Sequence, residues 1–276
     1  MALRPVWVRA LAALLLALLA GASAAVPRPE ESRAEADTIS SVMLGFHHRD
    51  CAFAVKHLNS GLKARYPGIY VLAGSMYEEG LCLKASWEQA ERMYLRAHEA
   101  GHGAGLLRLV AGLARDNRDI GAALWWVQRA SGAVLPDDCR VGDAERADPE
   151  AFVRALRGWP AGRAEACAYV AGVLAFLVGD AEYPRSSIAL GLTGRVELRY
   201  TPAVERMEWK TLEITEQALY GVASGDTVGD RRSRKFRQQF ETAMKELGAN
   251  ALKRFSRPAG VDPAWLLRVE FVFDLR

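Results

Sequence analysis

The fold is decided by residues 183–200, which read YPRSSIALGLTGRVELRY. In the second half of this stretch, Val196, Leu198 and Tyr200 alternate with charged residues. Alternation with a period of two is typical of a strand that buries one face and exposes the other. The stretch therefore predicts a half-buried strand at residues 195–200.

Two further alternating runs follow toward the C-terminus. The run at residues 207–214 slips its phase around Lys210-Thr211, as a strand with a β-bulge would. The final run, residues 267–275, alternates apolar residues with mostly charged ones. Between these two runs, apolar residues from Phe236 to Phe255 recur every three to five positions, which is typical of a helix with one buried face. The predicted order of the C-terminal part is strand, strand, helix, strand.

Residues 181–276 resemble the C-terminal domain of TonB, the periplasmic module through which Gram-negative bacteria reach outer-membrane receptors. The resemblance depends on the Tyr183-Pro184 start, the order of the predicted elements and the phenylalanine-rich final strand. The chain departs from the family at residues 201–205, where the usual Asp-Gly turn is missing, and at residues 221–229, where the loop is long. The resemblance implies a small β-β-α-β domain that acts by protein contact.

In TonB-like domains a partner adds a strand to an exposed edge of the sheet, so that backbone hydrogen bonds provide affinity. By this resemblance, the contact region comprises the start of the domain and its last two strands. The residues expected to bind the partner are Tyr183, Pro184, Arg185, Met207, Trp209, Val269, Phe271 and Phe273. The expected partners are envelope proteins, with an outer-membrane receptor as one candidate, and no cofactor is expected.

A repeat with a period of about 33 residues occupies the first half of the chain. Its best copy, Ile69–Gly103, combines small residues such as Gly74 and Ala90 with larger ones such as Tyr77 and Tyr94. Small residues let the two helices of a hairpin approach closely, while larger ones fill the seam. The copy resembles the Sel-like branch of the tetratricopeptide repeats, which form helical hairpins.

A weaker copy follows at Ala104–Gly132, and the copy before Ile69 is degenerate. A single hairpin cannot bury its apolar face alone, so stacked units are expected, with Asp148–Val178 as the cap of the stack. The resemblance implies an α-α solenoid of Sel-like hairpins over residues 38–180, whose concave surface binds a second partner. An ordinary helical bundle without that role is the alternative. The fold class expected for the whole chain is α+β.

The N-terminus has the pattern of a secretory signal peptide. Positive residues precede the apolar run Ala10–Ala20, and small residues follow it up to Ala24. Residues 1–24 are therefore expected to be removed, and residues 25–37 to form a charged linker. The apolar run is short for a membrane span, which needs about 20 residues. A periplasmic location is the prediction, and an uncleaved anchor in the inner membrane is the alternative.

The composition suits an exported globular protein. Half of the residues are hydrophobic (50%), a quarter are charged (25%), and the formal net charge of +3 is too small to indicate nucleic-acid binding. Four cysteines, an even number, suit an oxidising periplasm. The sequential pairing, Cys51 with Cys82 and Cys139 with Cys167, is expected because each bond would join neighbouring helices. Buried free thiols are the alternative.

Residues 98–102 read His-Glu-Ala-Gly-His, which matches the H-E-x-x-H pattern of zinc peptidases. In that pattern, two histidines one helical turn apart hold the metal and the glutamate activates water. Arg108 stands at the third ligand position of the longer pattern, where a cation would repel zinc. If Gly101 ends the helix, His98 and His102 do not share one helical turn. The sequence therefore predicts no metal site and no enzyme, with a zinc peptidase through His98 and His102 as the alternative.

Five cations lie at the start of the last predicted helix. They are Arg231, Arg232, Arg234, Lys235 and Arg237. Cations at a helix start oppose the helix dipole, so helix stability does not explain them. Contact with anionic lipid headgroups or with an acidic partner is one interpretation, and a solvated basic face is the other.

The sequence as a whole predicts an exported cell-envelope scaffold or adaptor. It would bind its partners through the helical repeats and through the edge of the sheet. A membrane-anchored energy transducer of the TonB type is the alternative. That alternative requires a retained anchor and a long proline-rich arm, whereas residues 26–37 contain two prolines and lead directly into the repeats.

Overall fold

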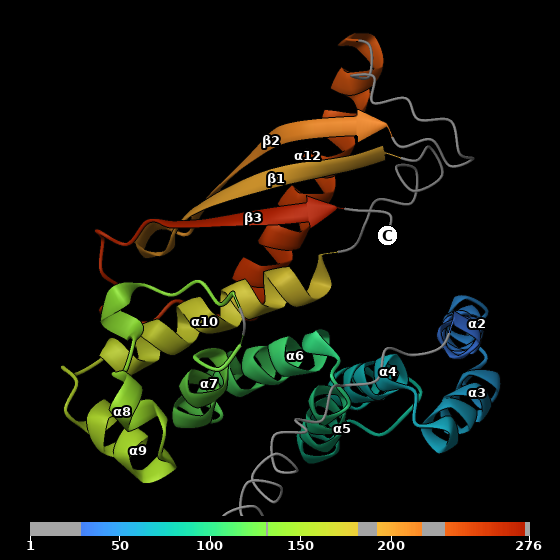
Figure 1. Ribbon diagram of the computed structural model, residues 1–276, viewed down its shortest axis with the longest axis horizontal. Coiled ribbons are helices and arrows are strands. Elements are labelled where there is room, and N and C mark those ends of the chain that lie inside the picture. Colours follow the sequence, from blue (N-terminus) through green and yellow to red (C-terminus); the bar gives the residue numbers. More distant parts are fainter. Residues whose placement is uncertain (1–28, 131, 182–191, 217–229, 274–276) are drawn as a thin grey trace, which may run out of the picture. The chain divides into compact units, whose positions relative to one another are not determined.

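The computed structural model describes residues 29–130, 132–181, 192–216 and 230–273 (Figure 1). The described part is mostly helical, with ten α-helices and one antiparallel sheet of three strands, which confirms the α+β class. The chain divides into two compact units between Tyr66 and Pro67. The expected signal peptide, residues 1–24, lies outside the described residues.

The first unit contains a helical hairpin formed by α2 (Pro29–His47) and α3 (Cys51–Ala64). The carboxylate of Asp50 accepts a hydrogen bond from the Phe53 amide at 2.9 Å and so caps the start of α3. The helices approach closely at Gly45, where an added Cβ would lie 2.7 Å from the Ala54 Cβ. Helix α2 begins within the stretch that was expected to be a linker, so residues 29–37 are helical rather than irregular.

The second unit begins with two helical hairpins, as the repeat predicts. Ser86 and Asp119 cap the second helix of each hairpin by accepting hydrogen bonds from the amides of Gln89 and Ala122. The hairpins comprise α4 (Pro67–Glu79), α5 (Trp87–Glu99), α6 (Gly103–Ala114) and α7 (Ile120–Val127). These helices cover the two copies of the repeat, and whether they form a solenoid of the Sel-like type stays a prediction.

The seam between α4 and α5 depends on Gly74. A Cβ at Gly74 would overlap the ring of Tyr94, which is fully buried and donates a hydrogen bond to Glu78. Gly74→Ala should therefore lower the free energy of unfolding by about 1 to 3 kcal/mol, although alanine favours helices. Urea unfolding of the two proteins measures the difference. Gly121→Ala is the matched control, because its Cβ would meet only the Asp119 carboxylate at 3.5 Å, and an equal loss there would exclude this packing argument.

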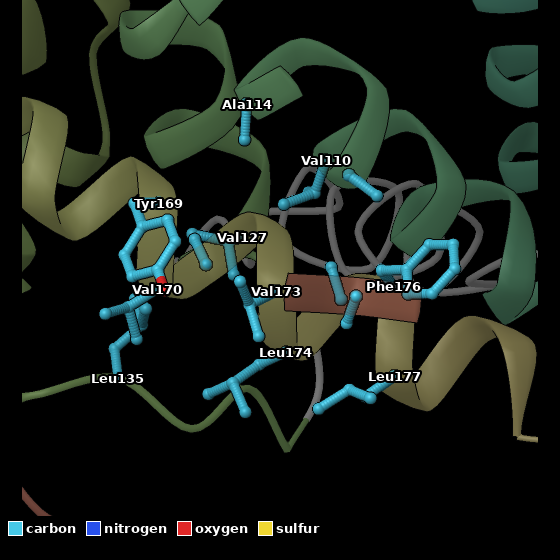
Figure 2. Close-up of a cluster of buried hydrophobic side chains, with 14 of the residues drawn as sticks. Val110, Ala114, Val127, Leu135, Tyr169, Val170, Val173, Leu174, Phe176 and Leu177 are labelled. Carbon is cyan, nitrogen blue, oxygen red and sulfur yellow. The ribbon is translucent and has the colours of Figure 1, made fainter. Parts of the chain in front are cut away.

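Helix α10 (Arg163–Asp180) lies at the centre of the second unit. Every residue from Ala166 to Leu177 is buried, as expected for a helix that is apolar on all sides. It packs against α6, α7 and α12 (Asp230–Arg254), and Figure 2 shows its side chains pointing into this core. The sequence predicts that this segment caps the repeats. A cap keeps one face in solvent, which α9 (Pro149–Arg157) does, whereas residues 166–177 of α10 are buried; whether Asp148–Val178 acts as the cap stays a prediction.

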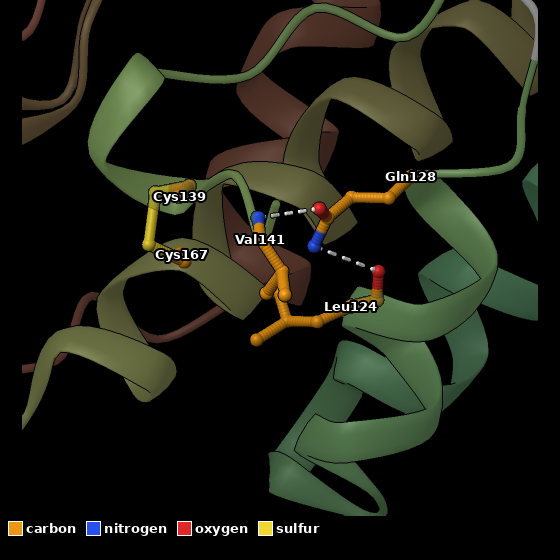
Figure 3. Close-up of a disulfide and its surroundings, with 5 residues drawn as sticks. All are labelled: Leu124, Gln128, Cys139, Val141 and Cys167. Carbon is orange, nitrogen blue, oxygen red and sulfur yellow. Dashed lines mark hydrogen bonds between the residues drawn. A yellow bond between two sulfur atoms is a disulfide. The ribbon is translucent and has the colours of Figure 1, made fainter. Parts of the chain in front are cut away.

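A disulfide and a hydrogen bond hold the segment between α7 and α10 against these two helices (Figure 3). It contains the short helices α8 (Asp143–Arg146) and α9 (Pro149–Arg157). Cys139 forms a disulfide with Cys167 on α10, which confirms that part of the expected pairing. The side chain of Gln128 accepts a hydrogen bond from the Val141 amide at 2.8 Å and donates one to the Leu124 carbonyl at 3.3 Å. Cys51 and Cys82 are disulfide-bonded as well, so the free-thiol alternative is excluded.

The sheet contains β1 (Leu192–Thr201), β2 (Arg206–Glu216) and β3 (Leu267–Phe273) in the antiparallel order β2-β1-β3. The order of elements, β-β-α-β, is the one that the sequence predicts. The predicted bulge is present on β2, where the register shifts so that Leu212 has no partner on β1. In place of the missing Asp-Gly turn, a single 3-10 turn at Pro202–Val204 joins β1 to β2, and Glu205 closes it with a φ of 52°.

The sheet and the helices share one hydrophobic core. Helix α12 packs against β2, and the ring of Phe240 on α12 lies 5.1 Å from that of Phe273 on β3. At the other end of α12, the ring of Phe255 lies 6.1 Å from that of Phe176 on α10. The expected division at residue 180 therefore falls within one unit and does not separate two cores.

A buried ionic network joins the α4–α5 hairpin to the end of α12. Its centre is Glu78 on α4, whose side chain is only 2% exposed. The Tyr94 hydroxyl donates to one carboxylate oxygen at 2.8 Å, and Arg254 donates to the other. Arg115 and Arg118 lie 3.7 and 3.9 Å from the same oxygen that Arg254 contacts. Four side chains from three other parts of the chain therefore converge on one carboxylate.

Candidate functional site

An apolar cleft of about 410 Å³ lies between α6, the end of α7, α10 and β3. Its lining is mainly aliphatic and includes Leu106, Leu107, Val127, Leu174, Val178 and Val269. A cleft of this volume lies within the range of about 300 to 1,000 Å³ that is usual for small-molecule sites. Two residues with polar groups, His98 and Arg129, also line it.

The cleft is open because several residues along its walls are glycine or alanine, whose side chains do not fill the space. Gly101 and Gly103 join α5 to α6, and Gly101 has a φ of 84° that favours glycine. Ala171 and Ala175 provide short side chains on α10. The remaining wall follows α7 and reaches Val134, and it leads into the segment that the Cys139–Cys167 disulfide holds against α10.

The polar rim of the cleft is organised around two tryptophans. The Arg129 guanidinium lies over the ring of Trp125, 3.0 Å from its centroid, and donates to the Trp125 carbonyl at 2.9 Å. It also donates to the carbonyl of Arg146. The ring of His98 meets that of Trp126 edge-on, with centroids 5.7 Å apart.

The charge of Arg129 lacks a carboxylate partner among the described residues, since its hydrogen bonds go to two backbone carbonyls. Partial desolvation of its guanidinium and the nearby positive charge of Arg146 both lower the pKa of Arg129. Arg146, in contrast, pairs with Asp143 one helical turn away. The rim of the cleft therefore has a cation that an anionic group would stabilise.

Strand β3 connects the cleft to an edge of the sheet. Val269 lines the cleft, while Val272 points to the other face of the strand and is 66% exposed. A second groove, more polar and about 520 Å³ in volume, lies between residues 134–138 and residues 264–268. The segment after α7 therefore runs beside the start of β3.

The outer face of the sheet is charged. Arg195 on β1 lies 2.9 Å from Glu213 on β2 and 3.1 Å from Glu270 on β3, so one arginine links all three strands. These groups are exposed, and exposed ion pairs contribute little to stability. This face provides solubility and register rather than an apolar contact surface.

The residues expected to bind a partner lie mostly in the core. Val269, Phe271 and Phe273 are buried. Trp209 on β2 is half-buried, and its ring lies 5.6 Å from that of Phe271. Met207 is also half-buried and faces α12, since a Cβ at Gly248 would meet its sulfur at 2.9 Å. Most of the named side chains therefore hold the sheet to the helices.

Other expected contact residues lie outside the described structure. Tyr183, Pro184 and Arg185 belong to a stretch that is not described. The cations at residues 231–237 belong to the first turns of α12, but their side chains are not among the described ones. The contact with anionic headgroups that they suggest stays a prediction.

The H-E-x-x-H match does not form one helical face. Helix α5 ends at Glu99, Gly101 turns the chain with a positive φ, and His102 is the N-cap of α6. His98 and His102 therefore belong to two different helices, as the repeat interpretation predicts. Among the described residues, no group of three His, Cys, Asp or Glu side chains is placed to hold a metal ion.

No family model, curated protein or solved structure matches this chain. The likeness to TonB and to Sel-like repeats therefore depends on the residues quoted from the sequence and on the order of elements. In the part of the chain that the structure describes, no helix has the length and apolar character needed to cross a membrane. The sequence does not predict the cleft, because its walls come from three parts of the chain that are far apart in sequence, namely residues 98–134, residues 171–178 and Val269.

Proposed function

We propose that this protein is an exported component of the cell envelope that binds other proteins by strand addition at β3. The observation that carries the proposal is the position of β3 as a regular strand at an edge of the described sheet. An edge strand offers backbone donors and acceptors to an extended segment of a partner. The disulfides support export, because such bonds persist in oxidising compartments.

The regularity of β3 makes it a better template than the other edge. Strand β2 bulges at Leu212, and bulges disrupt pairing with a further strand. Strand β3 pairs with β1 from Leu267 to Phe273 without a register shift. The exposed side chain of Val272 would contact the side chains of the added strand.

A photo-crosslinking amino acid at Arg268 on β3 should capture an envelope protein in intact cells, and Val272→Lys in the same chain should reduce the capture at least tenfold. A lysine on an edge strand disfavours pairing with a further strand, by about 1.4 kcal/mol for a tenfold effect. The yield of the crosslinked band measures the effect. The melting temperature should not change, because Val272 is exposed.

Leu212→Lys is the matched control on the opposite edge, where the side chain is 37% exposed. It should leave the capture at Arg268 unchanged. Equal losses for the two lysine variants, or a capture that Val272→Lys leaves intact, would mean that β3 is not the binding edge.

A further inference from the structure

We propose that the apolar cleft binds a fatty acid, with its alkyl chain between α6, α7 and α10 and its carboxylate at Arg129. This inference goes beyond the proposed function, because it concerns a small ligand and uses β3 only through Val269. It would make the protein a carrier or sensor of free acyl chains in the envelope.

The lining of the cleft fits an alkyl chain. Aliphatic side chains from α6, α7 and α10 form most of it, and Leu106, Val127 and Leu174 are among its buried members. Transfer of methylene groups from water to such surroundings is favourable and proportional to the area removed from water. The volume of about 410 Å³ lies at the lower end of the range for small-molecule sites, which suits one chain better than the two chains of a phospholipid.

The rim of the cleft selects the charge of the head group. Arg129 is exposed, lines the cleft and has no carboxylate partner among the described residues. The nearby Arg146 is paired with Asp143, so the positive charge that a carboxylate in the cleft can reach is that of Arg129. A carboxylate accepts paired hydrogen bonds from a guanidinium, which a neutral or cationic head group cannot do.

Two tryptophans provide a direct readout of binding. Trp125 lies beneath Arg129, and Trp126 contacts His98 at the rim. Titration of the full oxidised protein with saturated fatty acids of increasing length, below their micellar concentrations, should change the tryptophan fluorescence. The affinity should rise about three- to fourfold for each added methylene until the cleft is filled, and then level off.

The head group and the cleft are tested separately. The carboxylate should bind at least tenfold more tightly than the alcohol or the trimethylammonium compound of equal chain length, and Arg129→Gln should abolish that preference. Arg92→Gln is the matched control, because Arg92 is an exposed cation outside the cleft. Ala175→Phe should fill the cleft and abolish binding of all three compounds, and Leu107→Trp serves the same purpose if the first variant does not fold.

Several outcomes would overturn the proposal. Equal affinity for the carboxylate, the alcohol and the ammonium compound would mean that the cleft takes any apolar chain, including a side chain of a protein partner. An affinity that does not depend on chain length, or one that both cleft-filling variants leave intact, would place the binding elsewhere. Val272→Lys should not change the titration, so a failure of strand addition at β3 and a failure of fatty-acid binding remain distinguishable.

Discussion

Replacement of Glu78 by alanine should lower the free energy of unfolding by about 3 to 5 kcal/mol, because it removes the buried carboxylate on which Arg254, Arg115 and Arg118 converge. The Glu78 side chain is 2% exposed and that of Arg254 is 16% exposed. Burial opposes the charge of Arg254, but Glu78 and Glu79 outweigh burial and raise its pKa. The carboxylate is therefore what allows the charged arginine at the end of α12 to be buried beside α4 and α10.

The size of this effect follows from the number of groups that lose a partner. Without Glu78, the Tyr94 hydroxyl loses its 2.8 Å hydrogen bond in a site where the ring is fully buried. Among the described residues, Arg254 then keeps one carboxylate within ion-pair distance, that of Glu79 at 2.7 Å, and Glu79 is 39% exposed. The network also joins α4 to the end of α12, so its loss should weaken the packing between the α4–α5 hairpin and α12.

Urea unfolding of the purified protein measures the loss, and Glu88→Ala is the matched control. Glu88 forms an exposed pair with Arg92 at 2.8 Å, so its removal should cost only about 0.3 to 0.5 kcal/mol. The double variant Glu78→Met with Arg254→Met should recover part of the loss, because it removes the uncompensated charge of Arg254. If Glu78→Ala lowered the free energy of unfolding no more than Glu88→Ala, the network would not stabilise the packing of the α4–α5 hairpin against α12.

Removal of the Cys139–Cys167 disulfide should lower the free energy of unfolding by roughly 3 to 4 kcal/mol, which is the chain-entropy value for a loop of this size. The bond closes a loop with a sequence separation of 28, and both cysteines are fully buried. Alanine is the suitable replacement at both positions, because serine would leave hydroxyl groups in the core. The native contacts around Val141 remain, so the loss acts mainly through the denatured state.

Urea unfolding of the double alanine variant without reductant tests this expectation. The slope of the transition should also increase, because a chain without the cross-link exposes more surface when it unfolds. Reduction of the wild-type protein also removes the disulfide bonding of Cys51 and Cys82. It should therefore lower the free energy of unfolding at least as much as the double alanine variant does. An unchanged midpoint in the variant would show that the loop is held by Gln128 and the core alone.

The strands were predicted well because their signal is local. The alternation at Val196, Leu198 and Tyr200 gives the buried face of β1 directly, and all three side chains are 0% exposed. The slip in phase on β2 correctly predicts a bulge, although its position at Leu212 lies just after Lys210-Thr211. The sequence locates a bulge only to within a residue or two, because the extra residue shifts the alternation of apolar and polar positions without changing the composition of the strand.

The H-E-x-x-H match was also resolved by a local signal. Glycines follow Glu99 closely, and a glycine that can adopt a positive φ ends a helix. The sequence therefore indicates that His98 and His102 do not share a helical face, and the structure places them on two helices. The sequence does not predict the central position of α10 in the same way, because a continuous run of apolar residues shows that a helix is buried but not which elements cover it.

The sequence by itself determined many elements of this protein, namely the hairpins α4–α5 and α6–α7, the order β-β-α-β and a set of cysteines that form disulfides. These properties follow from the spacing of neighbouring residues and from helix ends, which act within one or two turns. Only the tertiary structure decided that α10 lies at the centre, that Glu78 meets Arg254, and that a cleft opens beside Arg129. Each of these depends on residues that are far apart in the chain, and they meet only when the whole core has packed.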